Sequence, residues 1–228
     1  MSIFPTKILL ATDGSEDAEL AASSAVELAK AGTSELHVLY VGPGLPLYEL
    51  PDYPARFEEV VAAQRQEAQR ILDDQVKGVE ALGATVVGVH VEMDERPERT
   101  IVELGEKLGA GLVVMGSRGL GGLRRTLMGS VSDSVVRHAH CPVIVARWKP
   151  VAFPAKILIA TDGSEGARLA VTTAADVAER TGSELHVVHV GEVRPVYHPE
   201  MRGYLARYEE LQQEARRLLE EQVEQVRA

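Results

Sequence analysis

The segment MGSRGLGGLRRTLMGS, residues 115–130, combines glycines, hydroxyl groups and arginines in one loop. Gly116 and Gly119 are separated by two residues, and nine residues separate Gly119 from Gly129, which is followed by Ser130. Glycines allow backbone N–H groups to approach a ligand closely, and guanidinium groups suit phosphate oxygens. The spacing therefore predicts a loop that holds a chain of phosphates; the alternative interpretation is a flexible glycine-rich connector.

The end of this loop is predicted to open a helix, in the segment SVSDSVVRHA. The first N–H groups of a helix have no acceptor within it and lie at the positive end of its dipole, so they favour an anion. We therefore expect the amides of Gly129, Ser130 and Val131 to point at a phosphate, with the Ser130 hydroxyl beside them. The cationic residues of the loop are Arg118, Arg124 and Arg125.

A second group of polar residues follows the first apolar strand, in the sequence ATDGSED that starts at Ala11. Glu16 and Asp17 suit the N-terminus of the next helix and would repel phosphate there. Asp13 is better placed to accept a hydrogen bond from a ribose hydroxyl or an adenine amino group, or to approach a metal ion held by phosphates. It also suits a turn or cap, and the two roles are compatible. Val41 and Ala11 are expected to supply apolar contacts to a base.

Apolar strands and amphipathic helices alternate along the first two thirds of the chain, which indicates a parallel α/β sheet with right-handed crossovers. Strands are predicted at 7–11, 36–41, 84–91, 112–115 and 143–146, and helices at 18–29, 55–82, 95–108 and from 130. The strands are nearly continuous Val, Leu and Ile, as expected when both sheet faces are covered. Ligands on such sheets bind outside the carboxyl ends of the strands, where the strand order reverses. If their strands are neighbours, Asp13 and Gly116 face one crevice.

The chain contains an internal repeat. KILLATDGSEDAELAASSAVELAKAGTSELHVLYVG from Lys7 and KILIATDGSEGARLAVTTAADVAERTGSELHVVHVG from Lys156 are identical at 21 of 36 positions, and the match resumes between QEAQRILDDQVKGV from Gln66 and QEARRLLEEQVEQV from Gln213. Residues 84–147 have no counterpart. We therefore expect a complete domain in 1–148, a linker in 149–155 and the first half of a second domain in 156–228.

The second copy lacks the phosphate loop, so we expect it to have no nucleotide site of its own. Two strands and two helices cannot cover a parallel sheet, and the first strand of this copy would be left with an open edge. That edge requires docking on the first copy, pairing with another chain, or completion in a longer protein, and the sequence does not choose among these.

The composition narrows the classes of function. The chain has 228 residues and a formal net charge of −10, which argues against general nucleic-acid binding. No apolar stretch has the length of a membrane span and the N-terminus has no signal-peptide pattern, so we expect a cytoplasmic protein without a membrane segment. The single cysteine, Cys141, excludes an intrachain disulfide framework. No set of side chains has metal-ligand spacing, because His138 and His140 lack a third ligand.

The motifs ATDGSE, LHVLYVG and Gly-x2-Gly-x9-Gly-Ser together resemble the universal stress proteins, in the subgroup that binds ATP. The resemblance covers residues 1–148 and, in 153–228, the first half of a second domain. It implies the doubly wound, five-stranded parallel sheet of the adenine nucleotide alpha hydrolase-like fold, in the order 3-2-1-4-5, followed here by a partial second copy. It also implies ATP with Mg or another divalent ion, dimerisation through the fifth strand, and a role in stress survival. The predicted binding residues are Ala11, Thr12, Asp13, Val41, Met115, Gly116, Ser117, Arg118, Gly119, Gly129, Ser130 and Val131.

Three functions remain open at this point. The first is an ATP-binding stress-response module that changes conformation or partner with nucleotide state. The second is a slow ATPase or other ATP-using enzyme on the same fold, although no general base is evident near a γ-phosphate. The third, a response-regulator-like or flavin-binding domain, ranks last, because the acid pair and distal lysine of a receiver are missing and so is a hydroxyl-rich phosphate loop after the first strand. We favour the binding module, as a homodimer formed along the edge strand at 143–146.

Overall fold

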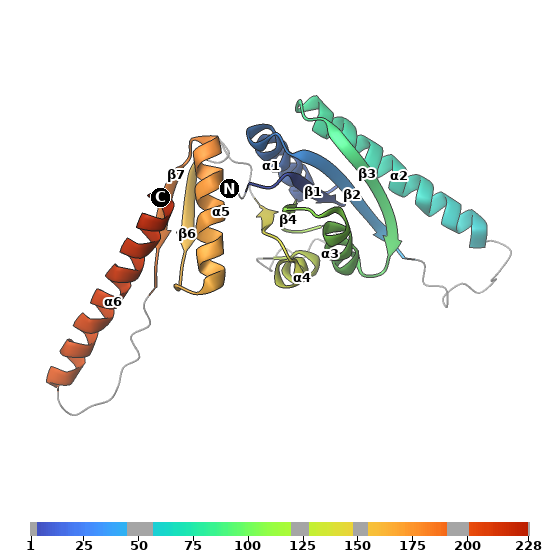
Figure 1. The fold of residues 1–228 in the computed structure, drawn as a ribbon. Helices are drawn as coiled ribbons and strands as arrows, with labels where there is room; N and C mark the ends of the chain where they lie inside the picture. The colour runs from blue at the N-terminus through green and yellow to red at the C-terminus, as the bar shows by residue number, and fades with distance from the viewer. Residues whose placement is uncertain (1–3, 45–56, 120–127, 148–154, 191–200, 228) are drawn as a thin grey trace. The chain divides into compact units, whose positions relative to one another are not determined.

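The structure, a computed structural model, describes residues 4–44, 57–119, 128–147, 155–190 and 201–227 (Figure 1). The chain divides into two compact units, Pro5–Phe153 and a second unit that combines Met1–Phe4 with Pro154–Ala228. Each unit has its own parallel sheet. Of the predicted linker, only Ala155 lies within the described residues.

The first unit is built on a five-stranded sheet in the order β3-β2-β1-β4-β5 (Figure 1). All neighbouring strands run parallel. The strands are β1 (Lys7–Thr12), β2 (Glu35–Pro43), β3 (Val86–Asp94), β4 (Leu112–Gly116) and β5 (Val143–Ala146). The predicted fold class and strand order are confirmed.

Four helices connect these strands and cover both faces of the sheet. They are α1 (Glu16–Gly32), α2 (Phe57–Ala81), α3 (Pro97–Leu108) and α4 (Ser130–His138). α1 packs on β1 and β4, α2 packs on β2 and β3, and α3 packs on α4. The face of α1 toward the sheet consists largely of small side chains, which allow the helix to lie close to it, and its buried alanines are Ala18, Ala21, Ala22, Ala25 and Ala29.

The core between the sheet and the pair α3 and α4 lies directly below the carboxyl ends of the strands. Alternate residues of a strand face the same side, so one face of β1 and β2 carries Leu9, Ala11 and Leu39 to this core. The remaining buried members of the cluster are Ile101, Leu104, Val113, Met115 and Val135. This core forms the floor on which the functional site is built.

The reversal of strand order lies between β1 and β4. Ala11 of β1 lies opposite Met115 of β4 in the parallel register. The chain leaves β1 toward β2 and β3 on one side and returns to β4 on the other. The turn at Asp13 and the loop from Gly116 therefore start at the same edge of the sheet, as the crevice prediction required.

The predicted bounds of the third strand and the predicted start of the helix after it each shift by a few residues. β3 continues to Asp94, because it pairs with β2 as far as Pro43. The Asp94 carboxylate then accepts hydrogen bonds from the Arg96 N–H at 2.9 Å and the Thr100 hydroxyl at 3.0 Å. α3 accordingly begins at Pro97. Proline suits this first position, because an N–H there would have no acceptor within the helix and its absence costs no hydrogen bond.

The second unit has a two-stranded parallel sheet and two helices. β6 (Lys156–Ala160) pairs with β7 (Glu184–Val188), and α5 (Glu165–Thr181) and α6 (Met201–Arg227) pack on them and on each other. Phe4 belongs to this unit, where the Arg180 guanidinium lies 4.7 Å from the centre of its ring. The repeated sequence therefore forms the same β-α-β-α order in both units.

Candidate functional site

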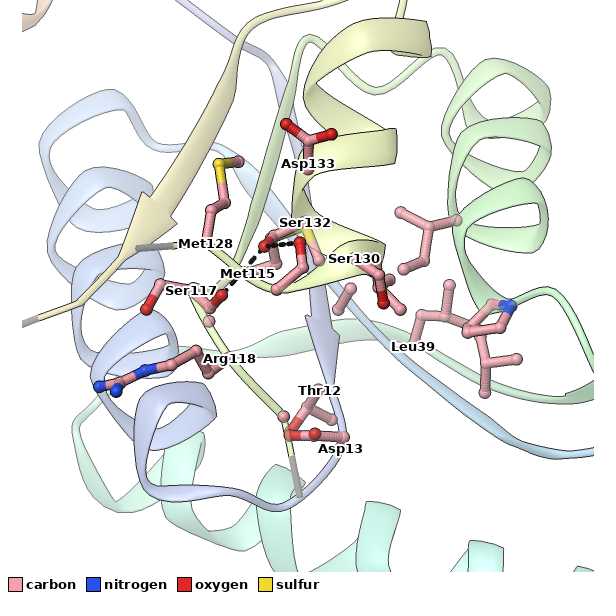
Figure 2. A pocket seen from close by; sticks show the side chains of 18 residues that line it. Thr12, Asp13, Leu39, Met115, Ser117, Arg118, Met128, Ser130, Ser132 and Asp133 are labelled. Atoms are coloured by element: carbon pink, nitrogen blue, oxygen red, sulfur yellow. Dashed lines mark hydrogen bonds between the residues drawn. The ribbon is translucent and has the colours of Figure 1, made fainter. Parts of the chain in front are cut away.

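A cavity of about 680 Å³ opens at the carboxyl ends of β1, β2 and β4 (Figure 2). All twelve predicted site residues line it, so the structure brings together segments that are separate in the sequence. Six further lining residues were not predicted from the sequence: Leu39, Pro97, Ile101, Met128, Ser132 and Asp133. Arg124 and Arg125, which we expected to contribute cationic groups, lie outside the described residues.

The turn that carries Asp13 is held by its own side chains. The Asp13 carboxylate accepts a hydrogen bond from the Ser15 N–H at 3.0 Å, and Gly14 takes the left-handed φ of +78° that this turn requires. The Thr12 hydroxyl accepts the Gly14 N–H at 3.2 Å and donates to Gln75 of α2 at 2.9 Å. The turn role suggested for Asp13 is therefore real, and the side chain also lines the cavity.

Close approach, rather than an unusual backbone angle, constrains the glycines of the loop, most strictly at Gly116. None of Gly116, Gly119 and Gly129 has φ in the left-handed region. A Cβ on Gly116 would lie 2.8 Å from the carbonyl carbon of Asp17 and 3.0 Å from the backbone nitrogen of Ala18, so only glycine lets the end of β4 pass against α1. A Cβ on Gly119 would meet the carboxylate of Asp13, so that side chain would have to move from its position at the cavity.

Ser117 closes the base of the loop. Its carbonyl accepts a hydrogen bond from the Ser132 hydroxyl at 3.0 Å (Figure 2). The same carbonyl accepts the Gly129 N–H at 2.8 Å, and the Ser117 N–H donates to the Ala146 carbonyl at 2.7 Å. The two ends of the loop are thereby fastened to each other and to the end of β5. The expectation that the Gly129 amide faces a ligand is corrected here, because that N–H is engaged within the loop.

The amides that remain for a ligand belong to the first turn of α4. The first intrahelical hydrogen bond runs from the Asp133 N–H to the Gly129 carbonyl at 2.9 Å. The N–H groups of Ser130 and Val131 precede it and have no acceptor within the helix. Both residues line the cavity, and Ser130 is exposed. The positive end of the α4 dipole therefore faces the cavity.

Two charged side chains at the cavity are engaged within the protein. The Arg118 Nε lies 3.3 Å from the Asp17 carboxylate of α1, so its guanidinium is held on the α1 side. Asp133 accepts a hydrogen bond from the Arg137 Nε at 2.9 Å, and this bond lowers the pKa of the Asp133 carboxyl. Asp133 therefore adds a negative charge near the first turn of α4, which the sequence analysis did not anticipate.

One wall of the cavity is apolar. Ala11 and Met115 lie at the ends of β1 and β4, while Leu39 and Val41 come from β2. Pro97 and Ile101 complete this wall from α3. The alternation of β2 places Leu39 on the same face as Val41, so a signal for Leu39 was present in the sequence. No local pattern shows that the start of α3 covers the end of β2.

A flat, partly apolar molecule with an anionic tail matches these surfaces. The apolar wall suits a planar ring, the Asp13 carboxylate accepts hydroxyl or amino hydrogen bonds, and the α4 amides suit an anion. Among the residues that the structure describes, no group of three or more His, Cys, Asp or Glu side chains is arranged to hold a metal ion. Within the same residues, no helix combines the length and the apolar character needed to cross a membrane.

Comparison with known proteins gives consistent matches along both units. The family model described as the universal stress protein family matches residues 5–147 and 155–228. A universal stress protein of Methanocaldococcus jannaschii is 39% identical over 142 residues, which span 62% of this chain and 81% of the relative. One of Mycobacterium tuberculosis is 41% identical over 133 residues, 55% of this chain, but this match spans only 44% of the relative's length.

Solved structures agree with this result. A universal stress protein from Archaeoglobus fulgidus matches with a TM-score of 0.64 at 26% identity, over 90% of this chain and 71% of its own. The universal stress protein UspA from Lactobacillus plantarum matches with a TM-score of 0.55 at 28% identity, over 62% of this chain and 97% of its own. Since the family model spans most of both units and the sheet order agrees, the chain belongs to the universal stress protein family.

Proposed function

We propose that the first unit binds an adenine nucleotide, ATP with Mg or another divalent ion, and acts as a nucleotide-dependent binding module in a stress response. The observation that carries this proposal is the convergence of the Asp13 turn, the closed base of the glycine loop and the first turn of α4 around one cavity of about 680 Å³. A cavity of that volume lies within the range of small-molecule sites.

The lining residues suggest how the nucleotide lies. The phosphates fit at the first turn of α4, where the Ser130 and Val131 amides and the Ser130 hydroxyl lie. The base fits against the apolar wall that includes Leu39 and Val41, and Asp13 lies in the turn beside both β1 and the loop. This arrangement uses each class of predicted residue for the chemistry that its side chain or backbone can supply.

A divalent ion would be held chiefly by the phosphates. The described residues offer no cluster of three ligating side chains, and Asp13 is a single carboxylate at the cavity. Oxygen ligands from a few carboxylates together with phosphate and water are what Mg²⁺ accepts. The ion would supply neutralisation of phosphate charge, and Asp13 would orient it.

Binding is favoured over catalysis by the state of the two lining carboxylates. Asp13 accepts a hydrogen bond from the Ser15 N–H and Asp133 accepts one from Arg137. A general base needs a proton acceptor directed at the attacking water. Slow hydrolysis is the alternative function, because the α4 amides would stabilise charge on the phosphates, and release of ADP and phosphate from bound ATP would measure it.

The proposal includes one site per chain, a homodimer and a cytoplasmic location. β5 pairs with β4 on one side, and among the described strands nothing pairs with its other side, where Val143, Ile144 and Val145 are half-buried. A short apolar edge strand of this kind suits pairing with a second copy. The cytoplasm is where a binding module of this kind meets ATP.

Denaturing the purified chain and counting released nucleotide, with calorimetric titration of the nucleotide-free protein by ATP and Mg²⁺, tests the proposal. We expect about one adenine nucleotide per chain and loss of binding in Gly129→Asp, because a new carboxylate beside the Ser117 carbonyl repels phosphate and opens the loop. Gly166→Asp is the matched control, because it places the same side chain in the second unit, where a Cβ meets only Ser164 Oγ, at 4.0 Å. Two nucleotides per chain, or equal binding by Gly129→Asp, would overturn the assignment.

A further inference from the structure

Asp17 fastens the beginning of the glycine loop to α1. It lies in the first turn of α1 with its side chain only 14% exposed. Its Oδ2 accepts a hydrogen bond from the Ser117 hydroxyl at 2.7 Å and lies 3.3 Å from the Arg118 Nε. Ser15, the N-cap of the same helix, donates its hydroxyl to the Arg118 carbonyl at 3.3 Å. The α1 terminus therefore holds both loop residues that follow β4.

Comparison of the two copies of the repeat shows that Asp17 is not needed to start the helix. In the second copy, Gly166 stands where Asp17 stands in the first, while Ser164 and Glu165 match Ser15 and Glu16. The second copy still forms an N-capped helix, since the Ser164 hydroxyl accepts the Ala167 N–H at 3.2 Å. The carboxylate at this position thus occurs in the copy that carries the glycine loop, and the helix forms without it in the other.

The pairing keeps the Arg118 guanidinium away from the α4 amides. Arg118 lines the cavity, yet its side chain is only 33% exposed and lies against Asp17. Figure 2 shows the Arg118 side chain extending away from Ser130, on the side of α1. A guanidinium directs its donors at one carboxylate or at phosphate oxygens with similar preference, so the two anions compete for it.

We propose that Asp17 is a specificity-determining residue that sets how strongly the site prefers a long phosphate chain. This inference rests on the proposed nucleotide site. Each phosphate beyond the first adds negative charge that the Asp17 carboxylate opposes and that Arg118 could neutralise once released. A ligand that uses Arg118 binds fully only to those molecules in which Arg118 has left Asp17. Its apparent affinity is therefore the intrinsic affinity multiplied by the fraction of such molecules. The competition therefore affects ATP most, AMP less and adenosine least.

The substitution Asp17→Asn removes the negative charge of residue 17 while keeping a side chain of the same shape. The amide oxygen still accepts the Ser117 hydroxyl, so the loop base keeps its hydrogen bond while the bond to Arg118 weakens. Calorimetric titration with ATP, AMP and adenosine, each with Mg²⁺, should show affinity for ATP increased about three- to tenfold, AMP increased less and adenosine unchanged. Glu16→Gln is the matched control, because it removes one exposed carboxylate from the same helix turn and should leave the ratio of ATP to adenosine affinity nearly unchanged.

A double-mutant cycle assigns the effect to Arg118. Arg118→Gln should lower ATP affinity only slightly in the wild-type background and should remove most of the gain in the Asp17→Asn background, leaving only the part due to lost repulsion between Asp17 and the phosphates. Asp17→Gly, which installs the residue of the second copy, should also raise the ATP to adenosine ratio. It is the second variant if Asp17→Asn shows a folding defect by circular dichroism, and it removes the acceptor of the Ser117 hydroxyl together with the charge.

The outcomes distinguish this inference from the proposed function. If the wild-type chain binds ATP but Asp17→Asn leaves the ratio of ATP to adenosine affinity unchanged, or lowers affinity for all three ligands equally, Asp17 is only a structural support of the loop. An equal gain in Glu16→Gln would reduce the effect to general charge and would also overturn the inference. If neither wild type nor any variant binds any of the three ligands, the nucleotide site itself is wrong.

Discussion

The two copies of the repeat place nearly the same sequence in two different environments. KILLATDGSE forms β1 and its turn in the first unit, and KILIATDGSE forms β6 and its turn in the second. Leu9 of β1 is fully buried, whereas its counterpart Leu158 is 70% exposed. In the first unit α3 and α4 cover that face of the sheet, and this chain has no counterpart of them in the second unit. The strand therefore forms from local sequence, while its burial depends on elements encoded far away.

The turn after each strand has the same geometry in both copies. Gly14 and Gly163 have φ values of +78° and +79°, and the Asp162 carboxylate accepts the Ser164 N–H at 2.9 Å as Asp13 accepts the Ser15 N–H at 3.0 Å. The ATDG turn consequently folds without a phosphate loop beside it. It is the loop from Gly116, and not the turn, that distinguishes the copy for which we propose a nucleotide site.

The largest expected difference between the copies is in the free energy of unfolding after truncation of this strand leucine. Leu9→Ala should destabilise the first unit by about 2–5 kcal/mol, because it leaves a cavity in a packed core. Leu158→Ala should change the stability of the second unit by less than about 0.5 kcal/mol, because the side chain is already in water. Chemical denaturation followed by circular dichroism on the full chain measures both.

A result in which Leu158→Ala costs as much as Leu9→Ala would contradict this comparison. It would show that the exposed face of β6 is covered in solution. Analytical ultracentrifugation of the same variants would then report whether a second copy of the chain packs on this face of β6, because truncating a contact residue would shift the oligomeric state.

The strands and helices of the first unit could be predicted to within a few residues, because apolar runs and helical periodicity are local properties. The order of the strands came from family resemblance, since nothing in the spacing of β3 and β4 states which of them lies beside β1. The predicted site residues lie together because each directly follows or ends a strand at one sheet edge. That rule locates the binding site at this sheet edge, and the residues at the strand ends line it.

The contacts that the sequence did not predict are long-range pairings. Arg118 meets Asp17 across about one hundred residues because Gly116 lets β4 pass against the α1 backbone. Ser117 takes the Gly129 N–H because the loop closes on itself, which removes one amide that helix geometry alone would have offered to a phosphate. Both findings depend on docking between elements, which no single segment encodes.

A smaller effect is expected at the helix caps. Ser15 and Ser164 each accept a helix N–H, from Ala18 at 3.3 Å and Ala167 at 3.2 Å, so Ser15→Ala and Ser164→Ala should each lower the stability of their own unit by about 1 kcal/mol. Only Ser15 also donates to the Arg118 carbonyl. Ser15→Ala should therefore weaken nucleotide binding in calorimetry while Ser164→Ala does not. Equal binding by both variants would show that the hydrogen bond between Ser15 and the Arg118 carbonyl does not affect the nucleotide site.

The smallest expected difference concerns acid sensitivity of the second unit. Hydrogen bonds from the Ser164 hydroxyl and N–H lower the pKa of Asp162 below its ordinary value. A carboxylate with a lowered folded pKa adds stability that is complete above the ordinary aspartate pKa of about 4 and is lost as the pH falls through the folded value. Asp162→Asn should therefore flatten the decline in stability of the second unit below about pH 4, measured by denaturant titrations at stepped pH. Because Asp162 is exposed to water, the change should be slight, and a decline unaltered by Asp162→Asn would mean that the turn's hydrogen bonds form equally well with the neutral acid.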